Sequence, residues 1–242
     1  MAASTKLRPR LESEGPRIAC FNRAKTPLGA DLDSLIAAMQ RYVDECVAPV
    51  WGTPARLMKS RGFVKGAWAI VFLERAGDKS TEGIHDLTPD GLPLAKVYVR
   101  TTLANKDMVS VSASHELVEM LVDPATNLMT SGPDAKAMYS YESADPVEDV
   151  SFDVNGIPMS DFVYPAYFET FHKPGSVPFD HSRKVRRPFE ILSGGYQQIF
   201  KRGRWTDIWG SAEKKTRFAQ EDRRGHRTQQ RQKRRLRPSD PV

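Results

Sequence analysis

The sequence contains few cysteines and no long apolar run. Cys20 and Cys46 are the only cysteines among 242 residues, which excludes a disulfide framework and is typical of a reducing compartment. No apolar run approaches the roughly 18 residues that a membrane-spanning helix needs. The first 17 residues also lack the apolar block of a secretory signal. We therefore expect a cytoplasmic protein with no part in a membrane.

The excess of positive charge is confined to the C-terminal quarter. Residues 183–242 carry 18 Lys or Arg and 6 Asp or Glu, a net charge of +12, whereas residues 1–182 carry −6. The run 223–237 contains no aromatic residue, so it favours contact with phosphates over stacking on bases. The basic segment 214–237 therefore predicts nonspecific nucleic-acid contact or a solvated tail that touches an acidic partner. Both interpretations stay open.

The pattern of apolar residues predicts one α+β domain between two disordered ends. We expect residues 1–16 and the basic tail 213–242 to be disordered, and residues 17–212 to form the domain. A helix is predicted from Asp31, which can cap it, to Pro49, which ends it. Apolar runs predict strands at two further ranges, 67–74 and 95–103.

Glycine-containing turns predict the hairpins and loops. Asn155-Gly156 is the strongest hairpin signal in the chain, and Arg202-Gly203 predicts a second hairpin. The segment 83–93 contains Pro-Asp-Gly and is predicted to be turn-rich. His85 falls in this segment, so we interpret it as a loop histidine.

One histidine and three carboxylates lie in an otherwise apolar segment, 112-SASHELVEMLVDP-124. We predict a helix over about residues 108–122, capped by Asn105 or Asp107 and stopped before Pro124. The density of apolar residues leaves little solvent-facing surface on this helix. An ionisable side chain on it therefore needs a partner, and a bound cation is a good one.

The ionisable residues share one side of this helix. Residues four and eight positions apart lie on nearly the same face, so His115, Glu119 and Asp123 point the same way. In the His-Glu-x-x-His motif, ligands one turn apart hold zinc and the Glu after the first His is the general base. Here Glu119 stands at the second ligand position and Glu116 at the base. Zinc accepts carboxylate oxygens, and Mn²⁺, Fe²⁺ or Ca²⁺ would also suit one histidine with several carboxylates.

A third ligand must come from outside the helix motif itself. The acidic loop 141–149 offers Glu142 and Asp145 as the best placed candidates, and Asp123 is the local competitor. The choice among these three stays open. The structural alternative is that Glu116 and Glu119 form the solvated face of an amphipathic helix and bind no metal.

Three segments together resemble an uncharacterised family often found in phage and prophage genomes. They are SHELVEMLVDP, YESADPVE and NGIPMSDFVYPAYF, which match a His-Glu-x-x-Glu helix, a later Glu-x-x-Asp and an aromatic segment. The pattern is more distantly similar to plant and microbial proteins with His-Glu-Leu-x-Glu, Thr-Asp-Pro and Glu-Ile-x-Asp, and both groups look like relatives of the zincin metallopeptidases. The resemblance covers roughly residues 30–210. It implies a zincin-like fold, with a small twisted mixed sheet and an active-site helix beneath it.

The helix motif and the resemblance together predict a zinc-dependent hydrolase that acts on a peptide or protein. Strand 95–103 is expected to offer an edge for substrate pairing. Tyr164 or Tyr167 is a candidate donor to the oxyanion, although core packing is the stronger expectation for both. The alternative is a catalytically inactive zincin-like domain with a structural or interaction role, in a phage particle or its assembly, with a basic tail that contacts nucleic acid.

Overall fold

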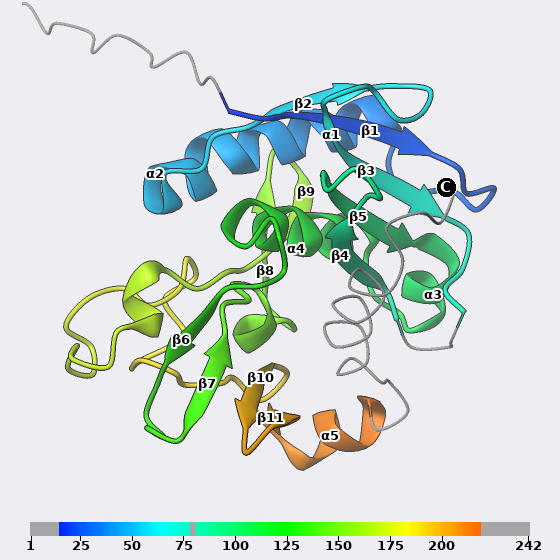
Figure 1. The fold of residues 1–242 in the computed structure, drawn as a ribbon. Helices are drawn as coiled ribbons and strands as arrows, with labels where there is room; N and C mark the ends of the chain where they lie inside the picture. Colours follow the sequence, from blue (N-terminus) through cyan, green and yellow to red (C-terminus); the bar gives the residue numbers. More distant parts are fainter. Residues whose placement is uncertain (1–14, 78–80, 219–242) are drawn as a thin grey trace, which may run out of the picture.

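The described residues, 15–77 and 81–218 of a computed structural model, form an α+β fold with three sheets (Figure 1). The helices are α1 (Leu32–Tyr42), α2 (Ala48–Trp51), α3 (Val99–Ala104), α4 (Val109–Val122) and α5 (Ala212–Phe218), with a π-helical turn η1 (Val43–Val47) and the 3-10 turns η2 (Asp145–Val147) and η3 (Pro165–Phe168). The strands are β1 (Arg17–Asn22), β2 (Arg56–Lys59), β3 (Trp68–Leu73), β4 (Gly83–Leu87), β5 (Pro93–Tyr98), β6 (Met129–Ser131), β7 (Ala137–Ser140), β8 (Ser151–Val154), β9 (Ile157–Ser160), β10 (Tyr196–Lys201) and β11 (Arg204–Trp209). Within the described residues, no helix has the length and apolar character needed to cross a membrane.

The largest sheet is mixed and has the strand order β2-β1-β3-β5-β4. Strands β1, β2, β3 and β5 are parallel, and β4 runs antiparallel to β5 at one edge. The predicted edge at 95–103 is therefore wrong, because β5 pairs with β3 on one side and β4 on the other, and residues 99–104 form α3. Among the described residues, the outer edge of β4 pairs with no further strand.

The sequence predicts a turn-rich loop over the whole of residues 83–93, but Gly83–Leu87 form strand β4. The Pro-Asp-Gly turn closes a hairpin in which Leu87 pairs with Pro93 and His85 with Ala95. The Thr88 N–H donates to the Leu92 carbonyl across this turn. Directly opposite residues of an antiparallel pair point to the same face of the sheet, so His85 lies on the same face as Ala95.

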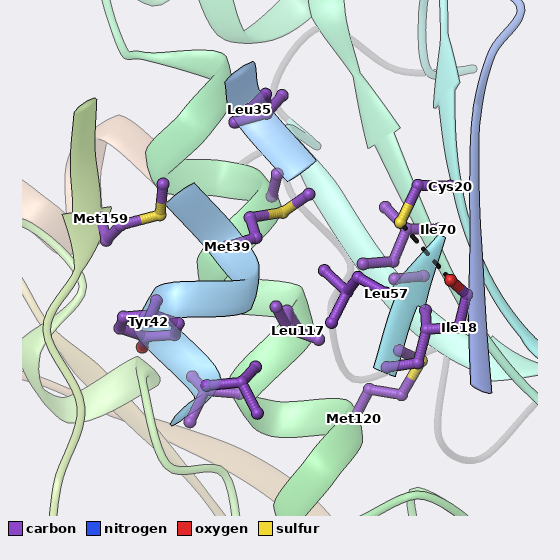
Figure 2. Packing of buried hydrophobic residues seen from close by; sticks show 14 of the residues in the cluster. Ile18, Cys20, Leu35, Met39, Tyr42, Leu57, Ile70, Leu117, Met120 and Met159 are labelled. Atoms are coloured by element: carbon purple, nitrogen blue, oxygen red, sulfur yellow. Dashed lines mark hydrogen bonds between the residues drawn. The ribbon is translucent and has the colours of Figure 1, made fainter. Parts of the chain in front are cut away.

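Helices α1 and α4 cover that face of the sheet. Ile70 and Phe72 of β3 belong to the core beneath the helices, while Ala69 and Val71 form a small cluster on the opposite face. Figure 2 shows the core between the helices and the sheet, with Leu35, Met39 and Tyr42 from α1, Leu117 and Met120 from α4, Ile18, Cys20, Leu57 and Ile70 from the sheet, and Met159 from β9. Helix α4 is therefore held between the sheet, α1 and the β8-β9 hairpin.

The first predicted helix forms, with a different end. Asp31 caps α1 by accepting a hydrogen bond from the Ser34 N–H. The helical segment continues through η1 and α2, where Pro49 stands in the first turn, and ends at Gly52 with a φ of 69°. Proline is tolerated in a first helical turn, so Pro49 does not end the segment as we predicted.

Helix α4 begins without the predicted side-chain cap. Met108 is its N-cap residue and makes no capping hydrogen bond through its side chain. Asn105 instead ends α3, and its side-chain amide donates to Glu82. Asn105 therefore follows the end of α3, and Asp107 lies in the connection between α3 and α4.

Both predicted hairpins are confirmed. Val154 pairs with Ile157 around Asn155-Gly156, and Lys201 pairs with Arg204 around Arg202-Gly203. All four turn residues have positive φ angles, the geometry of two-residue turns that match the twist of the flanking strands. The second hairpin belongs to the four-stranded sheet β11-β10-β7-β6, which lies at the opposite end of the molecule from β1 and β2 (Figure 1).

The two predicted disordered ends fall largely outside the described residues. Residues 1–14 and 219–242 are not described. Residues 213–218 form most of α5 instead of the start of a disordered tail. Lys214 is buried there, and its ammonium contacts Glu148 at 2.8 Å and Asp149 at 3.3 Å. These two ion pairs hold α5 against the loop that follows β7.

Candidate metal centre

Helix α4 carries its ionisable residues into the interior because neighbouring elements cover it. On one side of α4, the Ser114 hydroxyl accepts a hydrogen bond of 2.7 Å from the backbone N–H of Ser160 and so joins the helix to β9. On the side facing β4, His115, Glu116 and Glu119 are only 4–8% exposed. Buried charges at such positions need partners.

The first group of potential ligands joins α4 to η2. His115 Nε2 lies 3.4 Å from Glu119 Oε1 and 3.4 Å from Asp145 Oδ1. The ligand atoms of these three residues all lie within 4.8 Å of one another. The backbone N–H groups of Ala144 and Asp145 donate to Glu119 Oε1 and hold this carboxylate in place.

The second group adds a residue that the sequence interpretation missed. His85 Nδ1 lies 3.4 Å from Glu116 Oε2 and 3.5 Å from Glu119 Oε2. Its other ring nitrogen, Nε2, lies 3.7 Å from Glu142 Oε2. His85 is 6% exposed, so it belongs to a buried cluster and is no loop histidine. The only sequence signal was the hairpin turn that follows it.

These separations suit ligands of a common ion better than direct ion pairs. A charge-assisted N–H···O hydrogen bond measures about 2.7–2.9 Å. Two ligands at about 2.0–2.2 Å from a tetrahedral zinc are about 3.3–3.6 Å apart. The nitrogen-to-oxygen distances, both 3.4 Å in the first group and 3.4 and 3.5 Å around His85 Nδ1 in the second, fall in the second range.

The cluster strongly favours positive charge. Burial by itself lowers the pKa of each imidazole, but the carboxylates around His85 outweigh it and raise the pKa of His85 to about 9. The pKa of His115 is also raised well above its usual value, by Glu119, Asp145 and Glu116 against the effect of burial. Burial by itself raises the pKa of Glu119, but the two imidazoles lower it well below its usual value. A divalent cation would replace the protons on the imidazoles.

A cavity of about 120 Å³ adjoins both groups and has room for several water molecules. Eight of its lining residues are acidic and none is Lys or Arg: Glu82, Asp107, Glu116, Glu119, Glu142, Asp145, Glu148 and Asp149. It extends from the buried His115 to the exposed Asp149. Burial raises the pKa of Glu82 to about 8. With this acidic lining, the cavity is suited to binding cations or water molecules.

The structure separates the three candidates for the third ligand. Asp145 faces His115 directly, whereas Glu142 faces His85. The Asp123 oxygens accept the backbone N–H groups of Asn127 at 2.9 Å and Leu128 at 3.0 Å, and Asp123 belongs to neither group. Asp123 thus closes the loop after α4.

The two candidate oxyanion donors do not line the cavity. Tyr167 is fully buried in an aromatic cluster, where its hydroxyl lies 3.4 Å from Gln197 Oε1. The Tyr164 hydroxyl contacts His181 Nδ1 at 3.1 Å. Packing therefore accounts for both tyrosines, and the tyrosine that lines the cavity is Tyr196.

No known protein family, curated protein or solved structure matches this chain. The interpretation of the site therefore depends on its own geometry and chemistry.

Proposed function

We propose that the protein is a metal-dependent hydrolase and, more specifically, a zinc peptidase. His115 Nε2, Glu119 Oε1 and Asp145 Oδ1 would hold the ion. The observation that carries this proposal is the spacing of the buried ligand atoms. His115 Nε2 lies 3.4 Å from both carboxylate oxygens, a separation that suits two ligands of a tetrahedral ion, and all three atoms lie within 4.8 Å of one another. A mixed sheet with α4 packed against its β4-β5 edge also supports the zincin-like fold expected from the resemblance.

The residues around the proposed ion have distinct tasks. When bound, zinc supplies Lewis acidity that activates water and polarises a carbonyl group. The Ala144 and Asp145 N–H groups orient Glu119, which keeps one oxygen directed at His115. Glu116, the next residue along α4, lines the cavity and is the candidate general base that takes the water proton and passes it to the leaving amine.

An extended peptide is the substrate class that the neighbouring backbone favours. Gly83, Ile84 and His85 of the edge strand β4 line the cavity. An edge strand can pair with an extended peptide through main-chain hydrogen bonds. Strand β4 therefore takes the role that we first expected of residues 95–103.

Metal content tests the proposal. The protein would be purified without chelators or a histidine tag, and its metals measured by elemental mass spectrometry. We expect bound zinc or another divalent metal in the wild type and its loss in the His115→Ala/Glu119→Ala double variant. Glu116→Gln should then reduce peptide hydrolysis at least 100-fold, as loss of a general base does. A folded wild type that binds no metal when zinc is supplied would contradict the proposal.

The alternative function, an inactive structural or interaction module, is favoured by one observation. The raised pKa values of His85 and His115 allow two protonated imidazoles to neutralise carboxylates within the cluster. Such a network would need no ion. It predicts a stable, metal-free protein, the opposite outcome of the same measurement.

A further inference from the structure

We infer that the centre holds two divalent cations, with Glu119 as the bridging ligand. The second position is defined by His85, Glu116 and Glu119, beside the position defined by His115, Glu119 and Asp145. This inference rests on the proposed function for the first position and adds a second ion to it.

The orientation of Glu119 carries the argument. Its Oε1 lies 3.4 Å from His115 Nε2, while its Oε2 lies 3.5 Å from His85 Nδ1. One carboxylate thus presents a different oxygen to each histidine. Ions bound to the two oxygens of one carboxylate can lie about 3.5–4 Å apart, the usual separation in two-metal hydrolytic sites.

His85 provides an independent observation. Its Nε2 is buried and makes no hydrogen bond to the described residues. A buried ring nitrogen without a hydrogen-bond partner is unfavourable and calls for an explanation. A neutral imidazole that binds a cation through Nδ1 needs one partner only for its remaining N–H. Glu142 Oε2 lies 3.7 Å from Nε2, which is beyond hydrogen-bonding distance but on the side of the ring where a carboxylate orients a metal-bound histidine.

The charge of the ligand set also fits two ions. Glu116, Glu119, Glu142 and Asp145 can supply four negative charges, and no Lys or Arg lines the cavity among the described residues. One divalent cation bound at His115 leaves two of these charges, of which a protonated His85 could balance only one, and an uncompensated charge in a buried site is costly. Two divalent cations balance all four.

The second ion changes the task of Glu116. Its Oε2 lies 3.4 Å from His85 Nδ1, so with both positions filled Glu116 is a ligand. With only the first position filled, its carboxylate is available as the general base. The same residue therefore links the occupancy of the second position to the chemistry at the first.

The test is the metal stoichiometry of His85→Asn, with His172→Asn as the matched control. His172 contacts Glu169 and does not line the cavity. Full-length protein would be titrated with Mn²⁺ and its bound metal measured after removal of the excess. We expect about two equivalents in the wild type and in the control, and about one in His85→Asn and in Glu116→Gln.

Electron paramagnetic resonance of the wild-type protein provides a second measurement that does not depend on a variant. Exchange-coupled Mn²⁺ signals should appear only as the second equivalent binds. The two-ion centre would be overturned if the wild type bound only one equivalent and His85→Asn also kept it. Two bound equivalents without exchange coupling would overturn it as well. Either result would leave the proposed function standing. Absence of any bound metal would overturn both.

Discussion

At the scale of single residues, a second pair of buried carboxylates lies outside the candidate metal centre. This pair consists of Asp161 and Asp180, both fully buried. Asp180 accepts the backbone N–H groups of Lys184 and Val185, both at 2.9 Å. Burial, and then the neighbouring Asp180, raises the pKa of Asp161 to about 8. Asp161 therefore holds a proton in the folded protein at pH 7.

This pKa predicts the pH dependence of stability. The folded protein binds a proton at Asp161 from about pH 4 to pH 8, where the unfolded chain does not. The contribution of this group to the free energy of unfolding is therefore full below pH 4 and declines by up to about 1.4 kcal/mol per pH unit as the pH rises to 8. Asp161→Asn should remove this decline, so that the variant gains stability over the wild type with rising pH.

Urea unfolding at pH 5, 6, 7 and 8 measures this difference. The exposed Asp90→Asn is the matched control and should follow the wild type at every pH. If the difference between Asp161→Asn and the wild type did not change with pH, the protonated state of Asp161 would be refuted.

At the scale of elements, the centre depends on the close approach of β4 to α4. A Cβ atom added to Gly83 would lie 2.7 Å from Cγ of Glu116 and 2.9 Å from its Cδ. Because Glu116 is buried, it has little room to withdraw. Gly83→Ala should therefore destabilise the protein by about 1–3 kcal/mol, the usual effect of overpacking, and displace Glu116, a ligand of the proposed second ion.

Gly77→Ala is the matched control for this variant, since a Cβ there would meet nothing within 4 Å. Thermal unfolding would compare the two. Equal melting temperatures for Gly83→Ala, Gly77→Ala and the wild type would contradict the packing of Glu116 against β4.

The contact between β4 and α4 also explains which part of the site could be predicted from the sequence. His115 and Glu119 are one helical turn apart, so local geometry brings them together. Asp145 was one of two candidates in an acidic loop, and its choice over Glu142 required the fold. His85 was missed because its contact with α4 depends on the register of β4 with β5 and on the packing of α4 against this edge. Neither can be derived from the sequence around His85.

Fold prediction had the same limits. The hairpins at Asn155-Gly156 and Arg202-Gly203 were found because their turns need residues that tolerate positive φ. The sheet order was not predicted, since its parallel pairings connect strands that are distant in the chain. Pairings of this kind depend on packing of the whole domain, and local patterns do not specify them.

At the scale of the whole molecule, α5 links the start of the basic C-terminal segment to the wall of the cavity. Lys214 contacts Glu148 and Asp149, and both acids line the cavity. These contacts of Lys214 lie within the chain, and an acidic partner for the basic segment as a whole stays a prediction. The rest of the segment, residues 219–242, lies outside the described residues, so nucleic-acid contact there stays a prediction.

Lys214→Ala should destabilise the protein by about 1–3 kcal/mol, because it leaves the partly buried Glu148 carboxylate without its ammonium partner. Lys215→Ala, at an exposed position in the same helix, should have little effect. Chemical unfolding of both variants measures the contrast. Equal stability of the two would show that α5 is not anchored through Lys214.

The central claim is that His115, Glu119 and Asp145 bind a metal ion. Anomalous diffraction at the zinc absorption edge, from crystals grown with zinc, tests it most directly. We predict an anomalous peak within bonding distance of His115 Nε2, Glu119 Oε1 and Asp145 Oδ1. Ordered side chains at these positions with no peak between them would contradict the account and favour a structural ion-pair cluster.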